Sequence, residues 1–172
     1  MQSTRLHLRP WCETDAPALF KYASDPDVGP RAGWAPHKSV KESLDIIRKI
    51  FTNDTTWAIV LNGTDEPIGC IGYYTCQTSN IPIGENDCEV GYWLGKPFWN
   101  QGLCTEALRL MLDHCVKEKR FDNVWADCFT GNPASARVME KCGFRNTGMV
   151  NKCSHLVGGN EELVRIYKRQ YT

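Results

Sequence analysis

Hydrophobic and polar residues follow one another along this chain with two distinct periods. Leu6 and Leu8 alternate with polar residues over 5–9, as in a strand, whereas Leu44, Ile47 and Phe51 recur at helical spacing. Both patterns return several times before the end of the chain. Together they predict strands at 5–9, 57–61, 68–74, 88–94, 124–130, 144–150 and 162–171, and helices at 14–24, 39–53, 103–119 and 132–142.

The order of these elements, β-α-α-β-β-β-α-β-α-β-β, predicts the fold class. The turn signal Asn62-Gly63 indicates an antiparallel hairpin, and the long helix between strands 88–94 and 124–130 indicates a parallel crossover. We expect an α/β (mixed α+β) domain whose central sheet has about seven mostly antiparallel strands, with helices on both faces. With 172 residues and no repeat or linker, one domain is expected over 1–172, with its core at about 5–171.

The charge balance narrows the classes of partner. The chain has 20 Lys and Arg against 20 Asp and Glu, so it lacks the basic excess of dedicated nucleic-acid binders and of polybasic membrane anchors. No apolar run approaches the roughly 18 residues of a spanning helix, and the amino end does not resemble a secretory signal. We therefore expect a cytoplasmic protein that binds neither nucleic acid nor membrane.

The cysteine and histidine positions bear on redox state and on metals. The nine cysteines are odd in number, and even the closest pair, Cys70 and Cys76, is six positions apart. This pattern indicates free thiols in a reducing compartment. The four histidines do not cluster with the cysteines, whereas zinc sites need clustered ligands. No metal is expected.

The first segment that can carry chemistry is the loop 95–102 with the helix start that follows. A helix start presents unpaired N–H groups and a partial positive charge. Because Gly102 has no side chain, the amides of 101–105 are candidates for holding a phosphate or pyrophosphate. The alternative is an ordinary strand-to-helix turn capped by Thr105 or Asn100, and one glycine does not decide between them. The loop has neither a P-loop nor a dinucleotide-binding glycine pattern.

The second segment is the short helix 132–142. Asn132 suits the N-cap, Pro133 the first turn and Gly143 the position just past the end. These residues have structural roles at the ends of the helix. Ser135, in the first turn, is the residue of this segment without a clear structural role, so it is the candidate for a catalytic one. Its hydroxyl serves a reaction only if it points into the cleft between neighbouring strands.

Two motifs resemble the GNAT acyl-CoA N-acyltransferase superfamily. They are GYWLGKPFWNQGLCTEA, from Gly91 to Ala107, and NPASARVMEKCGF, from Asn132 to Phe144. The opening LHLRPW and the loop WAPH, which begins at Trp34, are similar to the branch that acetylates ribosomal-protein amino termini, the RimJ/RimL-like enzymes. The resemblance covers nearly the whole chain. Two positions depart from the family's phosphate loop: Trp99 replaces a leading Arg or Gln, and Cys104 occupies a Gly/Ala position.

The resemblance implies direct transfer of an acetyl group from acetyl-CoA to a primary amine, through a tetrahedral intermediate. A protein or peptide amino terminus is the favoured acceptor, because an α-amino group with a pKa of about 7.7–8.0 needs less of a base than a lysine near about 10.4. Backbone N–H groups on the strand 90–94 are expected to face the thioester. The residues implied in cofactor binding are Trp93, Leu94, Gln101, Gly102, Leu103, Cys104, Thr105 and Asn132, and those implied in acceptor binding are Trp34, His37 and Tyr74.

The catalytic roles implied by the resemblance fall on two residues. Ser135 is assigned as the proton donor to the departing thiolate, and Glu89 as a base acting through water. Three tyrosines, Tyr73, Tyr74 and Tyr92, are alternative donors that the sequence cannot rank. Glu89 also suits a second interpretation, a solvated carboxylate at a strand edge.

Other functions stay open at this point. Cys104, at a helix start where a thiol pKa can fall, permits an acetyl-cysteine route, although no histidine lies near it in sequence to serve as its base. The acceptor could instead be a small-molecule amine such as a polyamine, an aminoglycoside or an amino acid. A third alternative is a CoA-binding or partner-binding module without turnover. The sequence leaves monomer and homodimer equally open.

Overall fold

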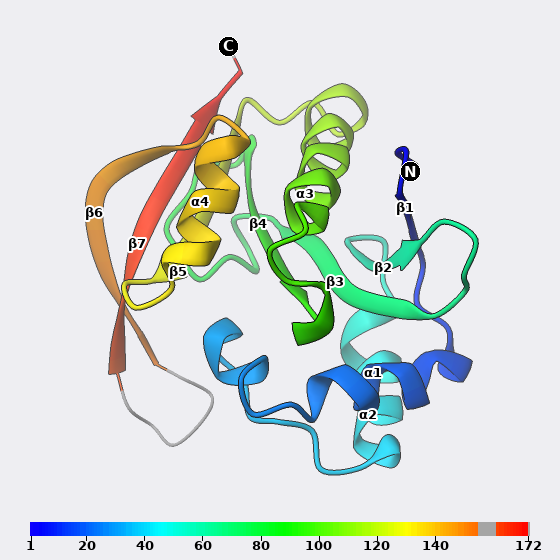
Figure 1. The fold of residues 1–172 in the computed structure, drawn as a ribbon. Coiled ribbons are helices and arrows are strands. Elements are labelled where there is room, and N and C mark those ends of the chain that lie inside the picture. The colour runs from blue at the N-terminus through cyan, green and yellow to red at the C-terminus, as the bar shows by residue number, and fades with distance from the viewer. Residues whose placement is uncertain (155–160, 172) are drawn as a thin grey trace.

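The computed structural model describes residues 1–154 and 161–171, and within these the strands form one seven-stranded sheet (Figure 1). Its order is β1-β2-β3-β4-β5-β7-β6. Every neighbouring pair is antiparallel except β4 and β5, which are parallel. The predicted fold class is thus confirmed. The strands are β1 (Leu6–Arg9), β2 (Thr56–Leu61), β3 (Pro67–Tyr74), β4 (Asp87–Leu94), β5 (Asn123–Phe129), β6 (Arg145–Ser154) and β7 (Glu161–Gln170).

The helices agree with the predicted order but are shorter than expected. They are α1 (Ala16–Ala23), α2 (Val40–Ile46), α3 (Leu103–Asp113) and α4 (Pro133–Lys141). The predicted helices 39–53 and 103–119 each end in a wider turn, Ile47–Phe51 and His114–Glu118. In the first of these turns the Thr52 N–H and hydroxyl both donate to the Ile47 carbonyl, five residues back.

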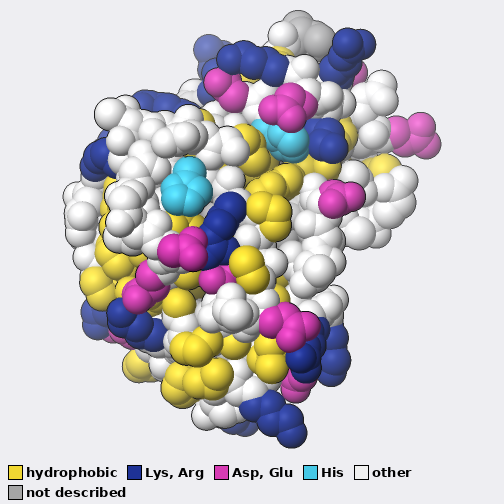
Figure 2. Space-filling model, turned by 90° about the vertical axis from the view of Figure 1, so that its right-hand side faces the viewer, with side chains coloured by type: hydrophobic (Ala, Val, Ile, Leu, Met, Phe, Trp, Pro, Cys, Tyr) yellow, Lys and Arg dark blue, Asp and Glu magenta, His cyan; other side chains and the backbone are white. Residues whose placement is uncertain are grey.

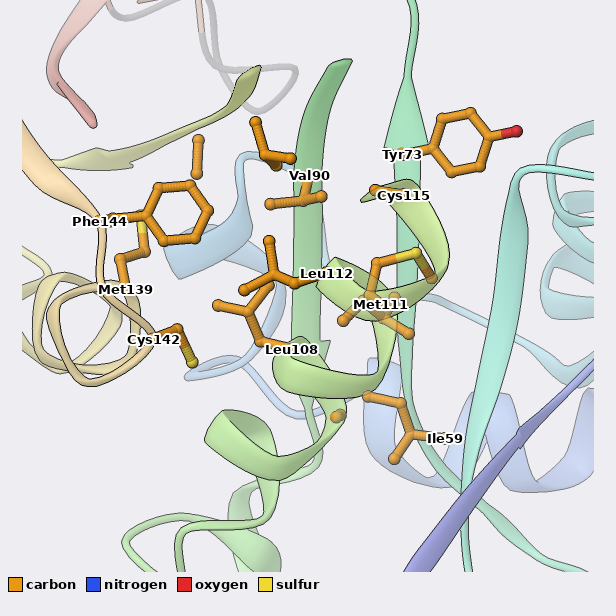
Figure 3. Packing of buried hydrophobic residues seen from close by; sticks show 14 of the residues in the cluster. Ile59, Tyr73, Val90, Leu108, Met111, Leu112, Cys115, Met139, Cys142 and Phe144 are labelled. Carbon is orange, nitrogen blue, oxygen red and sulfur yellow. The ribbon is translucent and has the colours of Figure 1, made fainter. Parts of the chain in front are cut away.

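Helices cover both faces of the sheet, as predicted. Ile59 and Ile71 face α3 and α4, whereas their neighbours Ala58 and Cys70 face α1 and the end of α2. In the first layer, the apolar side of α3 packs between the sheet and α4 (Figure 3). That cluster contains Val90 from β4, Leu108, Met111, Leu112 and Cys115 from α3 and the turn after it, and Met139, Cys142 and Phe144 from α4 and the segment that follows.

The parallel pairing between β4 and β5 is short, and side-chain hydrogen bonds fix its register at the first residues of the two strands. Asp87, only 7% exposed, accepts hydrogen bonds from the Asn123 side chain at 2.7 Å and from the Trp125 indole at 2.7 Å. The register then pairs 87–89 with 123–125, and no later residue of β4 pairs with a described residue of β5. The two strands therefore separate after Glu89.

The separation leaves main-chain groups of β4 without a strand partner. Gly95 donates to the Ile68 carbonyl at 2.8 Å, one step beyond the pair of Leu94 with Gly69. Because hydrogen-bonded and non-bonded pairs alternate in an antiparallel ladder, Leu94 and Tyr92 direct their N–H and C=O groups away from β3, toward the gap. This part of the strand lies within 90–94, where thioester-facing donors are expected.

One face of the molecule shows how charged side chains are distributed on its surface. On the face in Figure 2, basic and acidic side chains are interspersed, without a continuous patch of either sign. No helix in the described part of the chain is long and apolar enough to cross a membrane.

Gly69 offers a test of the close contact between β3 and β4. A Cβ at this position would lie 2.3 Å from the Trp93 carbonyl oxygen and 3.0 Å from the Leu94 Cα. We expect Gly69→Ala to lower the free energy of unfolding by about 1–3 kcal/mol, because backbone must move. Urea unfolding followed by circular dichroism measures this. Gly131→Ala, whose Cβ meets nothing within 4 Å, is the control, and equal stability of the two variants would contradict the prediction.

Candidate active site

The loop before α3 turns sharply and presents main-chain amides. Asn100 and Gly102 both have positive φ, 60° and 76°, and Gly102 is the N-cap of α3 without any side-chain cap. The first bond of the helix runs from the Glu106 N–H to the Gly102 carbonyl at 3.1 Å. Within the described residues, the N–H groups of 103–105 have no acceptor. The alternative prediction of a side-chain cap from Thr105 or Asn100 is therefore wrong, and these amides are available to an anion.

Side chains around the loop hold it in place. The Trp99 indole N–H donates to the Leu94 carbonyl at 2.8 Å, which closes the loop onto the end of β4. Arg5 donates to the Gln101 carbonyl at 2.9 Å and forms an ion pair with Glu106 at 2.6 Å. The Gln101 side chain donates to Pro97 at 2.8 Å. Trp99 thus fixes the loop mechanically in the position where the family usually has Arg or Gln.

The other predicted cofactor residues of this segment differ in how they are placed. Leu103 and Thr105 are buried, so their contribution is through main-chain amides. Burial raises the pKa of the Cys104 thiol. The expectation of a depressed thiol pKa is wrong, because desolvation of the thiolate outweighs the helix start. A thiol that stays protonated is a poor nucleophile, which disfavours an acetyl-cysteine route.

Ser135 and Tyr92 meet across the gap on the α4 side of the sheet. The Asn132 side chain caps α4 by accepting from the Ser135 N–H at 3.2 Å, as predicted for an N-cap. The Ser135 hydroxyl lies 3.0 Å from the Tyr92 hydroxyl, which also lies 3.2 Å from the Ser135 carbonyl. Burial raises the pKa of Tyr92 well above its usual value, so the phenol stays protonated. Of the three alternative tyrosines, Tyr92 is the one in contact with Ser135.

The opposite face of β4 carries the predicted base. Glu89 is 4% exposed, and its Oε2 accepts from the Ser79 hydroxyl at 2.7 Å and from the Asn80 N–H at 3.0 Å. The interpretation of Glu89 as a solvated carboxylate is therefore wrong. Tyr74, on β3, pairs with Glu89, and its ring lies 3.2 Å from the position of a Cβ on Gly91. The side chains of this face are thus Glu89, the small Gly91 and then Trp93.

The loop 26–36 approaches this same face. The Trp34 ring lies edge-on to Trp93, with centroids 5.5 Å apart, and 5.3 Å from the His37 ring. His37 has its Nδ1 2.8 Å from the Ser43 hydroxyl, so it also holds the start of α2. Trp34, His37 and Tyr74, predicted to bind the acceptor, therefore lie on the face of the sheet that carries Glu89. Trp93 turns its side chain to this face as well, while Leu94 directs its main-chain N–H to the gap.

Two residues at this site were missed by the sequence reasoning. Asp127, on β5, faces the same side of the sheet as Glu89, and the only signal for it was an acidic residue inside an apolar strand. Arg31 places its guanidinium 5.4 Å from the Trp99 ring, and its carbonyl accepts from the Asn132 side chain at 3.3 Å. Arg31 therefore bridges the loop and the start of α4, a contact between distant segments that no local pattern indicates.

A separate hollow of about 470 Å³ lies away from the gap between β4 and β5. None of the site residues described above lines it. Its walls are Pro10, Trp11, Phe51, Thr52, Asn53, Asp54, Trp57, His114 and Lys119.

A comparison with protein families matches residues 5–145 to the acetyltransferase (GNAT) domain. The chain belongs to the GNAT family of acetyltransferases. It is similar to the N-acetyltransferase p20 of Bacillus licheniformis, 27% identical over 99% of this chain and 97% of that protein. It is also 29% identical, over 54% of this chain and 51% of the other, to YdaF of Bacillus subtilis, whose name assigns it ribosomal N-acetyltransferase activity provisionally.

Solved structures show the same fold. A GNAT acetyltransferase from Bacillus anthracis superposes with a TM-score of 0.83 at 25% identity, over 98% of this chain and 96% of that one. GNAT enzymes use acetyl-CoA as co-substrate, and the residues present fit it: free amides stand at α3, and unpaired main-chain groups of β4 line the gap. No group of three side chains suited to a metal ion occurs among the described residues.

Gly102 tests whether the amides of α3 bind the cofactor. An alanine at φ +76° costs about 1–2 kcal/mol in the left-handed region. If that strain is relieved only by displacing the loop, acetyl-CoA binds roughly fivefold to thirtyfold more weakly, as measured by calorimetry. Gly148→Ala is the matched control, because Gly148 has a similar φ of +79° but lies on the edge strand β6 rather than in the loop before α3. Unchanged affinity in Gly102→Ala would argue against the amides as the phosphate site.

Proposed function

We propose that the protein transfers the acetyl group of acetyl-CoA to the amino terminus of a protein or peptide. The observation that carries this proposal is the arrangement at the gap between β4 and β5. A hydroxyl pair, Ser135 with Tyr92, lies on one face of the sheet, and the carboxylate of Glu89 lies on the other. A thioester in the gap is then flanked by a proton donor and by a negative charge.

The main chain supplies binding and orientation. The amides at 103–105 take the diphosphate, as an anion at a helix start. The outward main-chain groups of Tyr92 and the N–H of Leu94 pair with the amide groups of the pantetheine arm, in place of a neighbouring strand. The N–H groups in this stretch also stabilise the oxyanion of the tetrahedral intermediate.

Ser135 protonates the departing thiolate. A CoA thiolate, with a pKa near about 8.5 by analogy with cysteine, leaves more readily when it receives a proton. Tyr92 supports this role because its hydroxyl contacts the Ser135 hydroxyl at 3.0 Å and burial keeps it protonated. The capping bond from Asn132 fixes the first turn of α4, and so the position of Ser135.

The electrostatics of the acceptor face favour an α-amino group. At neutral pH roughly a tenth of such amines are already uncharged, against well below about 0.1% of lysine side chains. A carboxylate whose pKa is raised by burial, as that of Glu89 is, can therefore complete the deprotonation of an amino terminus much more readily. The provisional ribosomal N-acetyltransferase name of YdaF supports placing the chain in the RimJ/RimL-like branch. The cysteines form no disulfide among the described residues, which supports a cytoplasmic location.

A small-molecule amine is the second candidate acceptor. Glu89 and Asp127 place two carboxylates on the acceptor face, which suits a compact cation. The aromatic rings of Trp34 and Trp93 on the same face suit the backbone of an extended peptide as well as the carboxylates suit a small cation. A panel of free-amino peptides, polyamines, aminoglycosides and amino acids distinguishes these acceptors.

The decisive assay follows CoA thiol release in the presence of acetyl-CoA and that panel. We expect thiol release with peptides, and we expect Ser135→Ala to lower kcat by about 100-fold or more, as for loss of a general acid, with little change in the Kd of acetyl-CoA. Ser24→Ala, a serine at the end of α1, is the matched control.

Two outcomes would count against the proposal. If acetyl-CoA binds tightly but no member of the panel causes thiol release, the protein is better explained as a CoA-binding module without turnover. A drop in acetyl-CoA affinity as large as the drop in kcat would assign Ser135 a binding role.

A further inference from the structure

We infer that Asp127 is the catalytic residue that receives the proton of the acceptor amine, and that Glu89 is the fixed negative charge that holds the ammonium group beside it. This inference rests on the proposed function. It assigns a role to a residue that the motifs do not include and replaces the water-mediated base predicted at Glu89.

The register places Asp127 at the point where the strands separate. Glu89 is the last residue of β4 to pair with β5, opposite Trp125, and Asp127 is two positions further along β5 on the same face. The intervening Ala126 and the following Cys128 are buried in the layer under α3 and α4. Asp127 therefore borders the gap on the acceptor face.

The two carboxylates differ in their hydrogen bonds. Glu89 accepts two, from Ser79 and Asn80, both on Oε2, and these bonds stabilise its charged form and fix its orientation. Asp127 is half-buried, and its carboxylate has no hydrogen-bond partner among the described residues. The first arrangement suits a permanent anion, whereas the second suits a group that gains and loses a proton.

The electrostatics agree with this division. Burial, together with the nearby charge of Glu89, raises the pKa of Asp127 to about 7. Burial also raises the pKa of Glu89, but the bonds from Ser79 and Asn80 offset part of that rise, and Asp127 has no such bonds to its carboxylate. At neutral pH Asp127 is thus partly a carboxylate, and an incoming ammonium ion stabilises that form.

The other titratable groups that face Asp127 come from the neighbouring strands. Burial raises the pKa of Tyr74, on β3, to about 12 and also raises that of Cys153, on β6, so both are uncharged at neutral pH. On β7, Lys168 places its ammonium 4.7 Å from the Trp125 ring, and Glu162 pairs with Cys153. Glu89 is the group among them whose charge acts on Asp127.

Gly91 and the Tyr74 ring lie between these carboxylates and the gap. Gly91 follows Glu89 on the same face of β4, and the Tyr74 ring stands over it. Trp93 and the Trp34 ring close the far side. An amine held between Glu89 and Asp127 is therefore bordered by the Tyr74 ring and lies beside the gap that holds the thioester.

The proton and electron balance is complete with these residues. The ammonium N–H bond gives its proton to the Asp127 carboxylate, and the freed lone pair forms the N–C bond to the thioester carbonyl. The C–S bond then breaks, the sulfur takes the proton of Ser135, and the nitrogen's second proton restores the serine hydroxyl through Tyr92 and solvent. Asp127 finally releases its proton to solvent, so the products are the amide, CoA thiol and one proton.

The first test is the pH profile of kcat with a free-amino peptide. In the unmodified protein kcat rises through pH about 7, as Asp127 becomes a carboxylate. Asp127→Asn should lower kcat by about 100-fold or more, abolish that rise and leave acetyl-CoA binding unchanged. The control is Asp113→Asn, an exposed carboxylate on α3 that pairs with Lys117, which should leave both kcat and its profile as they are.

The second test needs no turnover and follows the Asp127 side-chain carboxyl carbon by NMR. We expect it to titrate near pH 7. Glu89→Gln should move that titration to lower pH, because it removes a charge that raises the pKa, and should raise the KM for the acceptor. The rise of kcat on the acidic side of its pH profile should shift to lower pH by the same amount as the Asp127 titration.

The outcomes separate this inference from the proposed function. Titration of Asp127 near its ordinary value of about 4, or an Asp127→Asn variant that keeps the kcat profile, would overturn the inference while thiol release continues. Loss of turnover in Glu89→Gln with Asp127 still titrating near 7 would return the base role to Glu89. Absence of thiol release from the unmodified protein with every acceptor refutes both.

Discussion

The rest of the structure depends on the short parallel contact between β4 and β5. Asp87 binds Asn123 and Trp125 together and so fixes the first pairs of an otherwise antiparallel sheet. After Glu89 the strands separate, and polar main-chain groups of β4 are left facing a gap. Such groups are costly to bury unpaired, so the gap suits a ligand with alternating amides. The pantetheine arm of acetyl-CoA has that chemistry.

The period of a strand then divides the reaction between two faces. Along β4, Glu89, Gly91 and Trp93 face the acceptor loops, whereas Tyr92 faces α4 and Ser135. Amide formation from an ammonium ion removes protons from nitrogen and delivers one to sulfur. In the proposed mechanism, a single strand with the thioester along its edge therefore keeps the proton acceptor and the proton donor on opposite faces of the sheet.

Local patterns predicted what depends on local structure. The alternation at Leu6 and Leu8, the cap at Asn132 and the glycine at 102 each act within a few residues, and the element order, α4 and the loop all appear as expected. The wide turns after α2 and α3 were missed, because their cause is a bond to a carbonyl five residues back rather than a change in periodicity.

The chemistry of the site depends on contacts between distant segments, and there prediction was weaker. The partner of Ser135 is Tyr92, 43 positions away, and sequence offered three tyrosines without ranking them. Glu89 appeared as a surface carboxylate or a base because its donors, Ser79 and Asn80, lie in an irregular loop. Trp99 shows the converse: a departure from the motif keeps the loop in place through its indole N–H.

The two carboxylates show why residue type alone does not assign a role. A carboxylate that accepts two fixed hydrogen bonds is stabilised as an anion, so it is suited to hold a cation and poorly suited to accept its proton. One that is half-buried, without such bonds and near another negative charge, exchanges protons close to neutral pH. Glu89 and Asp127 carry the same functional group but differ in the hydrogen bonds that their carboxylates accept. In the proposed mechanism their environments therefore assign the fixed charge to Glu89 and proton transfer to Asp127, as in other enzymes that use carboxyl pairs.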